Sequence, residues 1–404
     1  MEKKRLLATG KPRLLRNINI SLILDIIKDK GPISRADVAR ISGISPPTVS
    51  HVVGRLILEG IVEEVGFAAS VGGRRPVLVR FDPTSSLVLG VDVAGSRCSA
   101  GLTDLAGHIL MKEVIHYPSD GGEEPLTLVR RLVGRLLDRA PGGGGKVRGI
   151  GLGVPGFVDS RQGLVLLAAG LQWKNLALKK DLEDSSGLPV FVDNNVRTLL
   201  RGEKWFGQAR GKDNAIYILI GTGIGAAIMI GGEIYAGTHQ VAGEIRYTLL
   251  DRHALHSLPE SLGFLEGRVA AAGVISRARQ GWIEAATKTG LGKPDQVQLT
   301  VEGITSAAEK GDALARELTR EMIEYLGMTV VNLSCLFDPE IVIFGGEVVE
   351  GFPGLLKELQ PIVQRFCPYP PRLVVTELRE DAGILGSVAS LLAREKRTLS
   401  FQGL

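Results

Sequence analysis

Hydrophobic and polar positions along the first 80 residues follow the period of helices. Residues 20–27 place apolar side chains at the spacing of one helical face, and Gly31 and Pro32 then interrupt the pattern. A second, short helix is predicted to begin at Ser34 as N-cap, with Asp37 at the capping-box position, and to run to about residue 41. The pattern therefore predicts two helices in close succession.

A third helix is predicted after the turn at residues 42–45, whose glycine is typical of a helix-turn-helix. Ser45 is the expected N-cap, and Pro46 occupies the first helical position, where a missing N–H costs little. The apolar stripe expected to face the core consists of Val49, Val52, Val53 and Leu56. The opposite face carries short polar and basic side chains suited to base edges and phosphates.

Two strand-like segments follow, joined by a glycine-rich tip that carries Arg74 and Arg75. Such a tip is typical of a wing, and paired arginines beside glycines suit a minor groove. A helical hairpin used for protein contact, with surface arginines on its loop, is the alternative interpretation. The winged helix-turn-helix predicts that DNA is contacted by Ser34, Arg35, Ser45, Pro47, Thr48, Ser50, His51, Arg55, Arg74 and Arg75.

Charge is divided unevenly along the chain. Residues 1–80 hold 14 Lys and Arg against 7 Asp and Glu, a net +7, whereas the other residues hold 34 against 37, a net −3. A basic head on a slightly acidic body indicates that the head meets a polyanion. Together with the helical spacing and the basic wing, this charge predicts that the head binds double-stranded DNA.

Beyond the head, the hydrophobic period changes to that of strands. Residues 87–110 read as three strands separated by glycine turns, and residues 215–237 repeat this pattern; helices and further strands follow each. A meander plus helices that occurs twice predicts two α/β lobes facing a cleft. The expected domains are a winged head at 1–82, a first lobe at 83–200, and a second lobe at 201–404 with a last helix able to return to the first lobe.

Composition argues against a membrane or secreted protein. No apolar run approaches the roughly 20 residues needed to span a bilayer, and the charged N-terminus lacks the apolar core of a secretory signal. Cys98, Cys335 and Cys367 lie far apart and fit neither a disulfide framework nor a metal cluster. We expect a cytoplasmic protein with three buried free thiols.

Polar side chains gather where a predicted strand gives way to an amphipathic helix, at Asp193, Asn194 and Asn195. Such positions often form ligand sites in α/β proteins. The cluster offers two amides beside a single acid. This pattern alone leaves open whether the site is catalytic or only holds a ligand.

The order of motifs resembles the ROK family, which contains bacterial sugar kinases and the sugar-responsive repressors related to them. The motifs, in family order, are "GGRRP", "GVDVAGS", "GIGLGVPGFVD", "GLQWKNLALKKDLE", "PVFVDNNV", "GTGIGAAIMIGGEIYAG", "AGEI" and "IVIFGGEV". The kinases lack the DNA-binding head, so the chain is similar to the repressor branch, which includes xylose and N-acetylglucosamine repressors. The resemblance implies an actin-like, sugar-kinase-type body that forms a homodimer or homotetramer.

The resemblance also bears on catalysis. Asn195 stands where the kinases have the Asp that takes the proton from the sugar hydroxyl, and an amide cannot accept that proton at pH 7. The kinase nucleotide loop appears as "DVAGS", which keeps Asp92 but loses the glycine pair. The turn Gly221, Thr222, Gly223 can cradle an anion, although hairpin geometry explains the same glycines. We therefore expect a vestigial nucleotide loop, no use of ATP and no catalysis.

The zinc site of the family is implied to be lost. Ser257, Pro259 and Phe264 stand where cysteines are expected, and these side chains cannot supply the ligands that zinc needs. Two nearby histidines, His253 and His256, leave a rewired site as an alternative. We predict no metal. The loop is expected to be held by apolar packing of Leu258, Leu262, Phe264 and Leu265.

Carboxylates are retained at the positions that bind sugar in the family. Glu244 in "AGEI" and Glu266 in "GFLE" are implied to hold sugar hydroxyls, and surface salt bridges are the alternative. Arg246 replaces a glycine, so its cation is expected to reshape the pocket or recruit an acidic ligand. Trp173 is expected in the core rather than as a stacking platform. The implied sugar-binding residues are Gln172, Asn194, Asn195, Glu244, Tyr247 and Glu266.

Together these features predict a transcriptional regulator, a repressor of carbohydrate metabolism genes, whose kinase-like cleft binds a small carbohydrate effector. Its operator is expected to be pseudo-palindromic. The effector must favour one of two arrangements of the DNA-binding heads. Two alternatives remain: a bifunctional regulator that still phosphorylates a sugar, and a regulator controlled by a partner protein, with the body as an interaction module.

Overall fold

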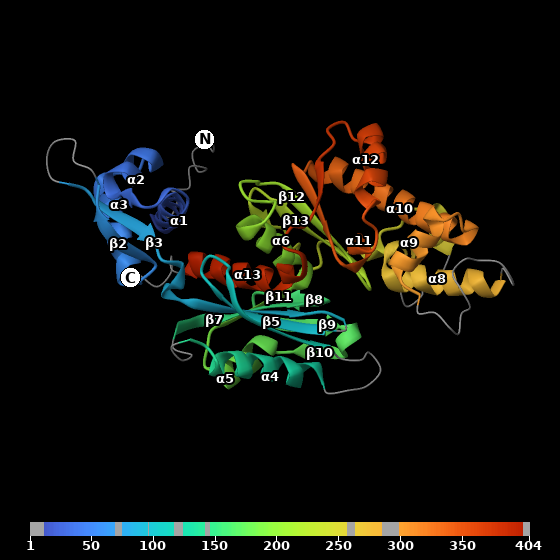
Figure 1. Ribbon diagram of the computed structural model, residues 1–404, viewed down its shortest axis with the longest axis horizontal. Helices are drawn as coiled ribbons and strands as arrows, with labels where there is room; N and C mark the ends of the chain where they lie inside the picture. The colour runs from blue at the N-terminus through green and yellow to red at the C-terminus, as the bar shows by residue number, and fades with distance from the viewer. Residues whose placement is uncertain are drawn as a thin grey trace, which may run out of the picture.

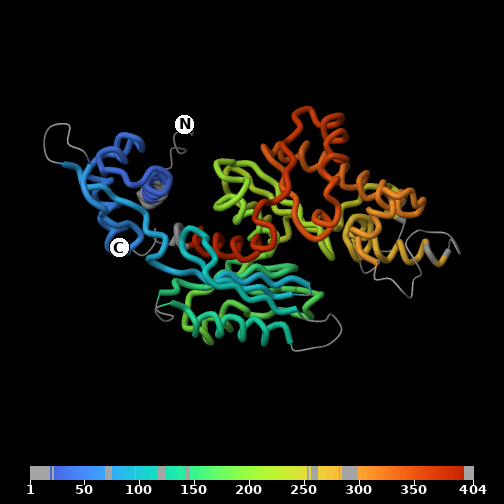
Figure 2. Tube along the Cα trace, in the orientation of Figure 1, coloured from blue at the N-terminus to red at the C-terminus, as the bar shows by residue number. Residues whose placement is uncertain are grey.

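The structure, a computed structural model, describes residues 12–68, 75–95, 97–116, 124–141, 146–256, 263–284 and 299–398. It consists of a small head and two α/β lobes, and the head lies at one end of the longest axis (Figure 1). The tube in Figure 2 shows the chain passing from the head into the first lobe, then into the second, and returning toward the first. The predicted fold class, a winged helix-turn-helix followed by a duplicated α/β body, is confirmed.

The head combines three helices with a three-stranded sheet in the order β1-β3-β2. Its elements are α1 (Pro12–Lys30), β1 (Ile33–Ser34), α2 (Arg35–Ser42), α3 (Pro46–Leu58), β2 (Val62–Phe67) and β3 (Val77–Phe81). The predicted apolar stripe of α3 is buried in the core of the head, with Val49 and Val53 fully inaccessible. β2 and β3 pair antiparallel, as two strands joined by a wing require.

The two predicted helix caps differ in their hydrogen bonds. The Ser34 hydroxyl accepts from the Asp37 N–H at 3.1 Å, which confirms Ser34 as the N-cap of α2. Ser45 holds the N-cap position of α3 as predicted, but its side chain makes no bond to a helix N–H. Its hydroxyl pairs with the Thr48 hydroxyl at 2.8 Å instead, so α3 begins without the expected side-chain cap.

The first lobe is built on a five-stranded sheet in the order β11-β7-β4-β5-β6. Its strands are β4 (Leu87–Val93), β5 (Arg97–Asp104), β6 (Ile109–His116), β7 (Val147–Val154) and β11 (Val190–Asn194). β4, β5 and β6 form an antiparallel meander, whereas β7 and β11 run parallel to β4. The lobe also contains α4 (Pro125–Asp138), α5 (Leu178–Ser186) and a small sheet of β8 (Phe157–Asp159), β9 (Leu164–Ala168) and β10 (Trp173–Leu176).

The second lobe repeats this arrangement in the order β14-β13-β12-β15-β16. Its strands are β12 (Ala215–Ile220), β13 (Ile224–Ile230), β14 (Glu233–Ile234), β15 (Ile341–Gly345) and β16 (Arg372–Val375). Three antiparallel strands again precede two parallel ones, so the predicted duplication is confirmed. One face packs against α7 (Glu266–Val269), α8 (Ala271–Glu284), α9 (Val301–Glu309), α10 (Ala313–Phe337), α11 (Glu347–Glu350) and α12 (Leu355–Phe366).

Two helices are exchanged between the lobes. α6 (Asn195–Phe206) follows the first sheet in sequence, yet it packs against Tyr217 and other buried residues of the second sheet. α13 (Ala382–Thr398) follows the second sheet, yet it packs on β4 and β7 of the first (Figure 1). The two helices meet in backbone contact, since a Cβ added to Gly202 would lie 2.9 Å from the Gly386 Cα. They form a shared layer between the sheets.

A short connection links the head to the first lobe. It consists of the single turn η1 (Pro83–Ser85), and the Asp82 N–H before it donates to the Ile61 carbonyl of the head at 3.0 Å. The Leu105 N–H of the first lobe donates to the Pro83 carbonyl, also at 3.0 Å. α6 runs without a break through residues 200 and 201, where a domain boundary was predicted; the boundaries stay predictions.

One prediction about the thiols is wrong. Cys98 and Cys367 are buried, but Cys335 is exposed, because it lies on the solvent side of α10 near the end of that helix. Among the described residues, no helix is long and apolar enough to cross a membrane.

Candidate functional site

The predicted DNA face of the head is partly accessible. Pro47, Ser50 and His51 on α3 are exposed, and Arg75 is exposed at the edge of the wing. Arg74 lies outside the described residues. A helix with exposed short polar side chains beside a basic wing is the arrangement that a winged helix presents to a groove.

Other predicted DNA contacts are already engaged within the head. Arg55 Nε lies 2.8 Å from a Glu59 carboxylate oxygen, and both side chains are about three-quarters buried. Arg35 is paired in the same way with Glu64 at 2.8 Å. Ser34 is 3% exposed and serves as a helix cap. These three side chains therefore support the shape of the head, and a phosphate would have to compete for the two arginines.

The polar cluster at the end of β11 forms the start of α6. The Asn194 side-chain oxygen accepts from the N–H groups of Val196 and Arg197, at 2.9 and 3.2 Å, which makes Asn194 the N-cap of the helix. Its amide nitrogen donates to the Gly156 carbonyl at 3.0 Å. The Asn195 oxygen accepts from the Val196 N–H at 3.0 Å. Asn194 thus holds the helix to the first lobe and keeps only part of its amide for a ligand.

A buried ion-pair network lies directly behind this cluster. Asp193 is 1% exposed and pairs with Arg197 at 2.6 Å and with Arg201 at 2.5 Å. The remaining Arg197 N–H groups donate to the carbonyls of Val158 in the first lobe and Gln240 in the second, both at 3.0 Å. Arg197 therefore joins the two lobes at the cleft. Sequence reasoning missed this role of Arg197. The visible signal was an arginine at the start of the predicted helix, four residues after Asp193 at the end of the strand.

The two predicted carboxylates, Glu244 and Glu266, lie close enough to interact electrostatically. Burial raises the pKa of Glu244; Arg246 and Arg197 act to lower it, and Glu266 raises it further. The separation between Glu244 Oε2 and Arg246 Nε is 3.0 Å, an ion pair whose N–H direction falls short of a hydrogen bond. The structure thus brings Glu244, Glu266, Arg246 and Arg197 together.

Arg246 of the second lobe reaches a side chain of the first lobe. Its guanidinium lies 4.7 Å from the centre of the Tyr247 ring and 5.6 Å from that of Phe157, which belongs to the first lobe. Tyr247 is 56% exposed, so its ring is available to a ligand on one side. Phe157 follows Gly156, the residue bonded to Asn194. Arg246 therefore connects the two lobes beside the predicted sugar residues, as Arg197 does at the start of α6.

The other predicted sugar residues occupy different settings. Gln172 is exposed in a left-handed conformation, φ 58°, at the end of a short turn beside β10. Trp173 is 5% exposed in the apolar core of the first lobe, which confirms the core interpretation. The structure gives no contact that joins Gln172 to the carboxylates, so it stays a prediction from the resemblance.

The predicted nucleotide loop is a tight hairpin between β12 and β13. The Gly221 N–H donates to the Gly223 carbonyl at 2.9 Å, and Gly223 lies directly against the Glu266 carboxylate. A negative group beside the turn disfavours a phosphate there. Asp92 is 8% exposed and packs against Gly383 in the first turn of α13; burial raises its pKa to about 6.

Within the described part of the chain, no group of three His, Cys, Asp or Glu side chains is placed to hold a metal ion. Ser257 and Pro259 lie outside it, as do the side chains of His253 and His256. Of the residues expected to hold the loop by apolar packing, Leu265 is fully buried and the Phe264 ring meets the Tyr325 ring edge-on at 5.6 Å. Leu258 and Leu262 also lie outside the described residues.

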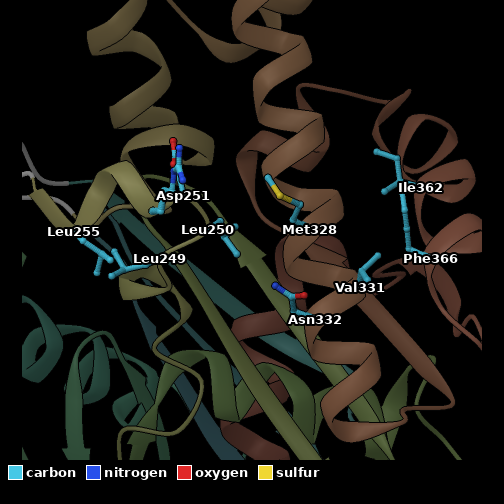
Figure 3. Close-up of a pocket in the computed structure, with 10 residues that line it drawn as sticks. Leu249, Leu250, Asp251, Leu255, Met328, Val331, Asn332, Ile362 and Phe366 are labelled. Carbon is cyan, nitrogen blue, oxygen red and sulfur yellow. The ribbon is translucent and has the colours of Figure 1, made fainter.

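The second lobe contains a separate cavity of about 690 Å³ (Figure 3). It opens between residues 249–255, α10 and α12, and none of the predicted site residues lines it. Its apolar lining side chains are Leu249, Leu250, Leu255, Met328, Val331, Ile362 and Phe366.

A winged helix-turn-helix joined to a duplicated two-lobed α/β body is the architecture of a regulator with a DNA-binding head. Comparison with known proteins agrees. A family model described as the ROK family matches residues 88–396, and one described as a winged helix-turn-helix DNA-binding domain matches residues 16–63. The chain belongs to the ROK family, and its head makes it a transcriptional regulator of that family.

Similar proteins span nearly the whole chain. The xylose repressor of Caldicellulosiruptor bescii is 29% identical over 95% of this chain and 98% of its own length. The N-acetylglucosamine repressor of Escherichia coli O157:H7 is 27% identical over 88% of this chain and 86% of its own length. A crystal structure of a ROK-family transcriptional regulator, a homologue of the Escherichia coli MLC protein, matches with a TM-score of 0.80 at 24% identity, over 96% of this chain and 98% of that one.

The body alone is similar to sugar kinases. A Streptomyces griseus ROK glucokinase, solved with glucose and AMPPNP, is 29% identical with a TM-score of 0.63, over 77% of this chain and all of that one. The ROK family model itself matches residues 88–396 and leaves the head to the winged helix-turn-helix model.

Proposed function

We propose that the protein is a cytoplasmic repressor of carbohydrate metabolism genes, released from or directed to its operator by a small sugar bound in the cleft. The observation that carries this proposal is the meeting of Glu244, Glu266, Arg246 and Tyr247 beside the start of α6 in a chain with a DNA-binding head. Carboxylates and an aromatic ring are the groups that sugar hydroxyls and sugar faces need. The names of the similar repressors point to the same class of effector.

The cleft supports binding better than catalysis. Phosphoryl transfer requires a group that takes or orients the proton of the attacking hydroxyl, and the corresponding position holds an amide, Asn195, whose oxygen accepts from the helix. Glu266 lies against the turn that would hold phosphates. We therefore propose a non-catalytic body that uses no ATP and no zinc. Sugar-dependent ATP turnover that Asn195→Ala abolishes would favour the bifunctional alternative instead.

Two measurements on one sample test the effector. Duplex DNA is first selected from a random pool by the full-length protein, and its affinity and the melting temperature are then measured across a panel of mono- and disaccharides. A sugar at a hundred times its Kd stabilises the protein by about 2.7 kcal/mol, because it binds only the folded state. By linkage, the same sugar changes the DNA affinity.

Glu266→Ala is expected to abolish both sugar responses while leaving sugar-free DNA affinity unchanged, because Glu266 lies in the body. Glu317→Ala is the matched control, an exposed glutamate on α10 of the same lobe. A panel in which no sugar shifts melting or DNA affinity would favour control by a partner protein.

Arg246 decides between neutral and acidic effectors. Removing it with Arg246→Gly frees Glu244 from its ion pair and opens the contact with Phe157. A neutral sugar should bind the variant at least as well as the wild type, whereas an acidic sugar should lose its counter-ion and bind about tenfold or more weakly. Weaker binding of a neutral sugar would show that Arg246 itself holds hydroxyls.

The wing is tested through the salt dependence of DNA binding. Arg75→Ala should reduce the slope of log affinity against log salt by about one, since one phosphate contact is lost. Lys310→Ala, an exposed lysine of the second lobe, is the control with the same change in net charge. Equal slopes in both variants would remove Arg75 from the DNA contact.

A further inference from the structure

We propose that α6 couples the cleft to the DNA-binding head, and that the contact between Lys28 and Trp205 is where this coupling enters the head. The inference rests on the proposed regulatory function but adds the physical route between its two sites. It follows from the positions of the two ends of one helix, at the cleft and at the head.

The first end of α6 is joined to both lobes. Asn194 bonds the first lobe at Gly156, and Arg197 donates to a carbonyl of each lobe, Val158 and Gln240. A change in the angle between the lobes therefore has to shift α6 or break one of these bonds. Arg197 is 3% exposed along its side chain, so a broken bond would leave a buried donor unpaired. Moving the helix is the less costly response.

The body of α6 transmits such a shift because it moves as a unit. The helix has 12 residues and is about 18 Å long. Gly202 lies in backbone contact with Gly386 of α13, so the two helices cannot move apart independently of their packing. In the same turn, Glu203 accepts a hydrogen bond from the Thr376 hydroxyl, which ties the helix to the second lobe.

The second end of α6 touches the head. The Lys28 ammonium of α1 lies 5.1 Å from the centre of the Trp205 ring and 4.6 Å from that of Phe81 in β3. Asp29, the next residue of α1, lies 3.9 Å from Arg210, just beyond the helix. Phe81, Trp205 and Phe206 pack together against a buried apolar cluster that includes residues of α13. The head thus packs against the C-terminal part of α6 and against the apolar cluster to which α13 contributes.

This contact is soft enough to act as a switch. A partly exposed contact between an ammonium and an aromatic ring changes an equilibrium by about two- to fivefold. Moving Trp205 away from Lys28 therefore alters the balance between head positions without unfolding anything. Because coupling between two sites is reciprocal, DNA bound to the head must in turn affect the cleft end of α6.

The test measures how DNA bound to the head affects the first turn of α6, with no sugar present. Full-length protein is studied free and bound to the selected duplex, and amide hydrogen exchange is followed in peptides covering residues 190–206 and 237–245. In the wild type, DNA should change exchange in the first turn of α6. Lys28→Met should reduce this difference two- to fivefold, because it keeps the side-chain length but removes the cation.

Lys30→Met is the matched control. Lys30 is exposed on the same helix, so its loss removes the same charge from the head and weakens general attraction to DNA equally. Trp205→Phe, which keeps an aromatic face, should retain more of the coupling than Trp205→Leu. Circular dichroism and the melting temperature show whether each variant is folded.

Each outcome supports or overturns the route. DNA that leaves residues 190–206 unchanged in the wild type, or equal effects of Lys28→Met and Lys30→Met, overturns it. A DNA-induced change that depends on Lys28, in a protein that answers to no sugar, supports the route and rejects the sugar effector. A normal sugar response in Lys28→Met rejects the route and leaves the sugar effector in place.

Discussion

The two ends of α6 are built from opposite kinds of interaction. At the predicted sugar site, Asp193, Arg197 and Arg201 form a network of charged hydrogen bonds around the buried Asp193 carboxylate. At the head, Trp205 and Arg210 make an aromatic contact and an exposed ion pair 3.9 Å long. The first end fixes where the helix starts relative to both lobes. The second end contacts the head through interactions that are individually weak.

The difference follows from burial. A charge inside the protein is stabilised only if it is paired and hydrogen-bonded, so its partners cannot be exchanged cheaply. An exposed ion pair contributes little and can be replaced by water. A regulator needs both kinds of interaction. Rigid bonds at the ligand site move the helix with the lobes, and weak contacts at the head allow the balance between head positions to change.

The largest expected effect breaks the firm end. Arg197→Leu leaves Asp193 with one arginine and takes the Arg197 donors from the carbonyls of Val158 and Gln240, which should lower the free energy of unfolding by about 3–5 kcal/mol. Urea unfolding followed by circular dichroism measures this loss. Arg210→Leu removes the same charge beyond the other end of the helix and should change stability very little. Equal losses would refute the distinction between the two ends.

The carboxylate of Asp92, on β4 and packed against the first turn of α13, is buried without an ion pair to any described residue that would stabilise its charge. Burial raises the pKa of Asp92 to about 6, with Arg97 acting weakly in the opposite direction. The protonated acid is therefore favoured in the fold, and stability falls as the pH rises from about 4 through 6.

Asp92→Asn removes this loss. The variant should match the wild type below pH 4 and exceed it by about 3 kcal/mol at pH 8, the free energy that corresponds to a shift of about two pKa units. Unfolding titrations at pH 4, 6 and 8 measure the gap. A gap that does not grow with pH would show that Asp92 is charged in the fold.

A smaller effect is expected where the two exchanged helices meet. Gly202→Ala would place a Cβ 2.9 Å from the Gly386 backbone, so the helices must separate, at a cost of about 1–3 kcal/mol. Gly134→Ala on α4 is the control, because nothing lies within 4 Å of its Cβ position, and it should be neutral or slightly stabilising. If Gly202→Ala leaves both stability and the DNA-induced exchange in α6 unchanged, close helix packing is not part of the coupling.

Much of the fold could be predicted because local periodicity encodes it. The apolar stripe of α3 and the two meanders are repeated patterns within single segments, and the structure follows them. The exposed Cys335 shows the limit of such reasoning, since three scattered thiols carry no periodic signal of burial.

The site could be predicted only in part. Glu244 and Glu266 lie on separate segments, so only the resemblance to the family predicted that they would lie near one another. The role of Asn194 was visible in the sequence as an asparagine between a strand and a helix, the usual place of an N-cap. The bonds from Arg197 to residues 158 and 240, and the seat of Lys28 on Trp205, depend on how the lobes and the head are placed. No local pattern records such distant contacts.

The exchange of helices has a consequence during synthesis of the chain. The first sheet ends at residue 194, but the helix that covers its inner face begins at residue 382. At about 5–20 residues per second, the ribosome needs roughly 10 to 40 s to add the missing stretch. Throughout that interval the head is complete, while Val88 and the other apolar residues that α13 buries await their cover. The DNA-binding head of a nascent chain is therefore complete before the body can fold. During that interval chaperones can bind the uncovered apolar face of the first sheet.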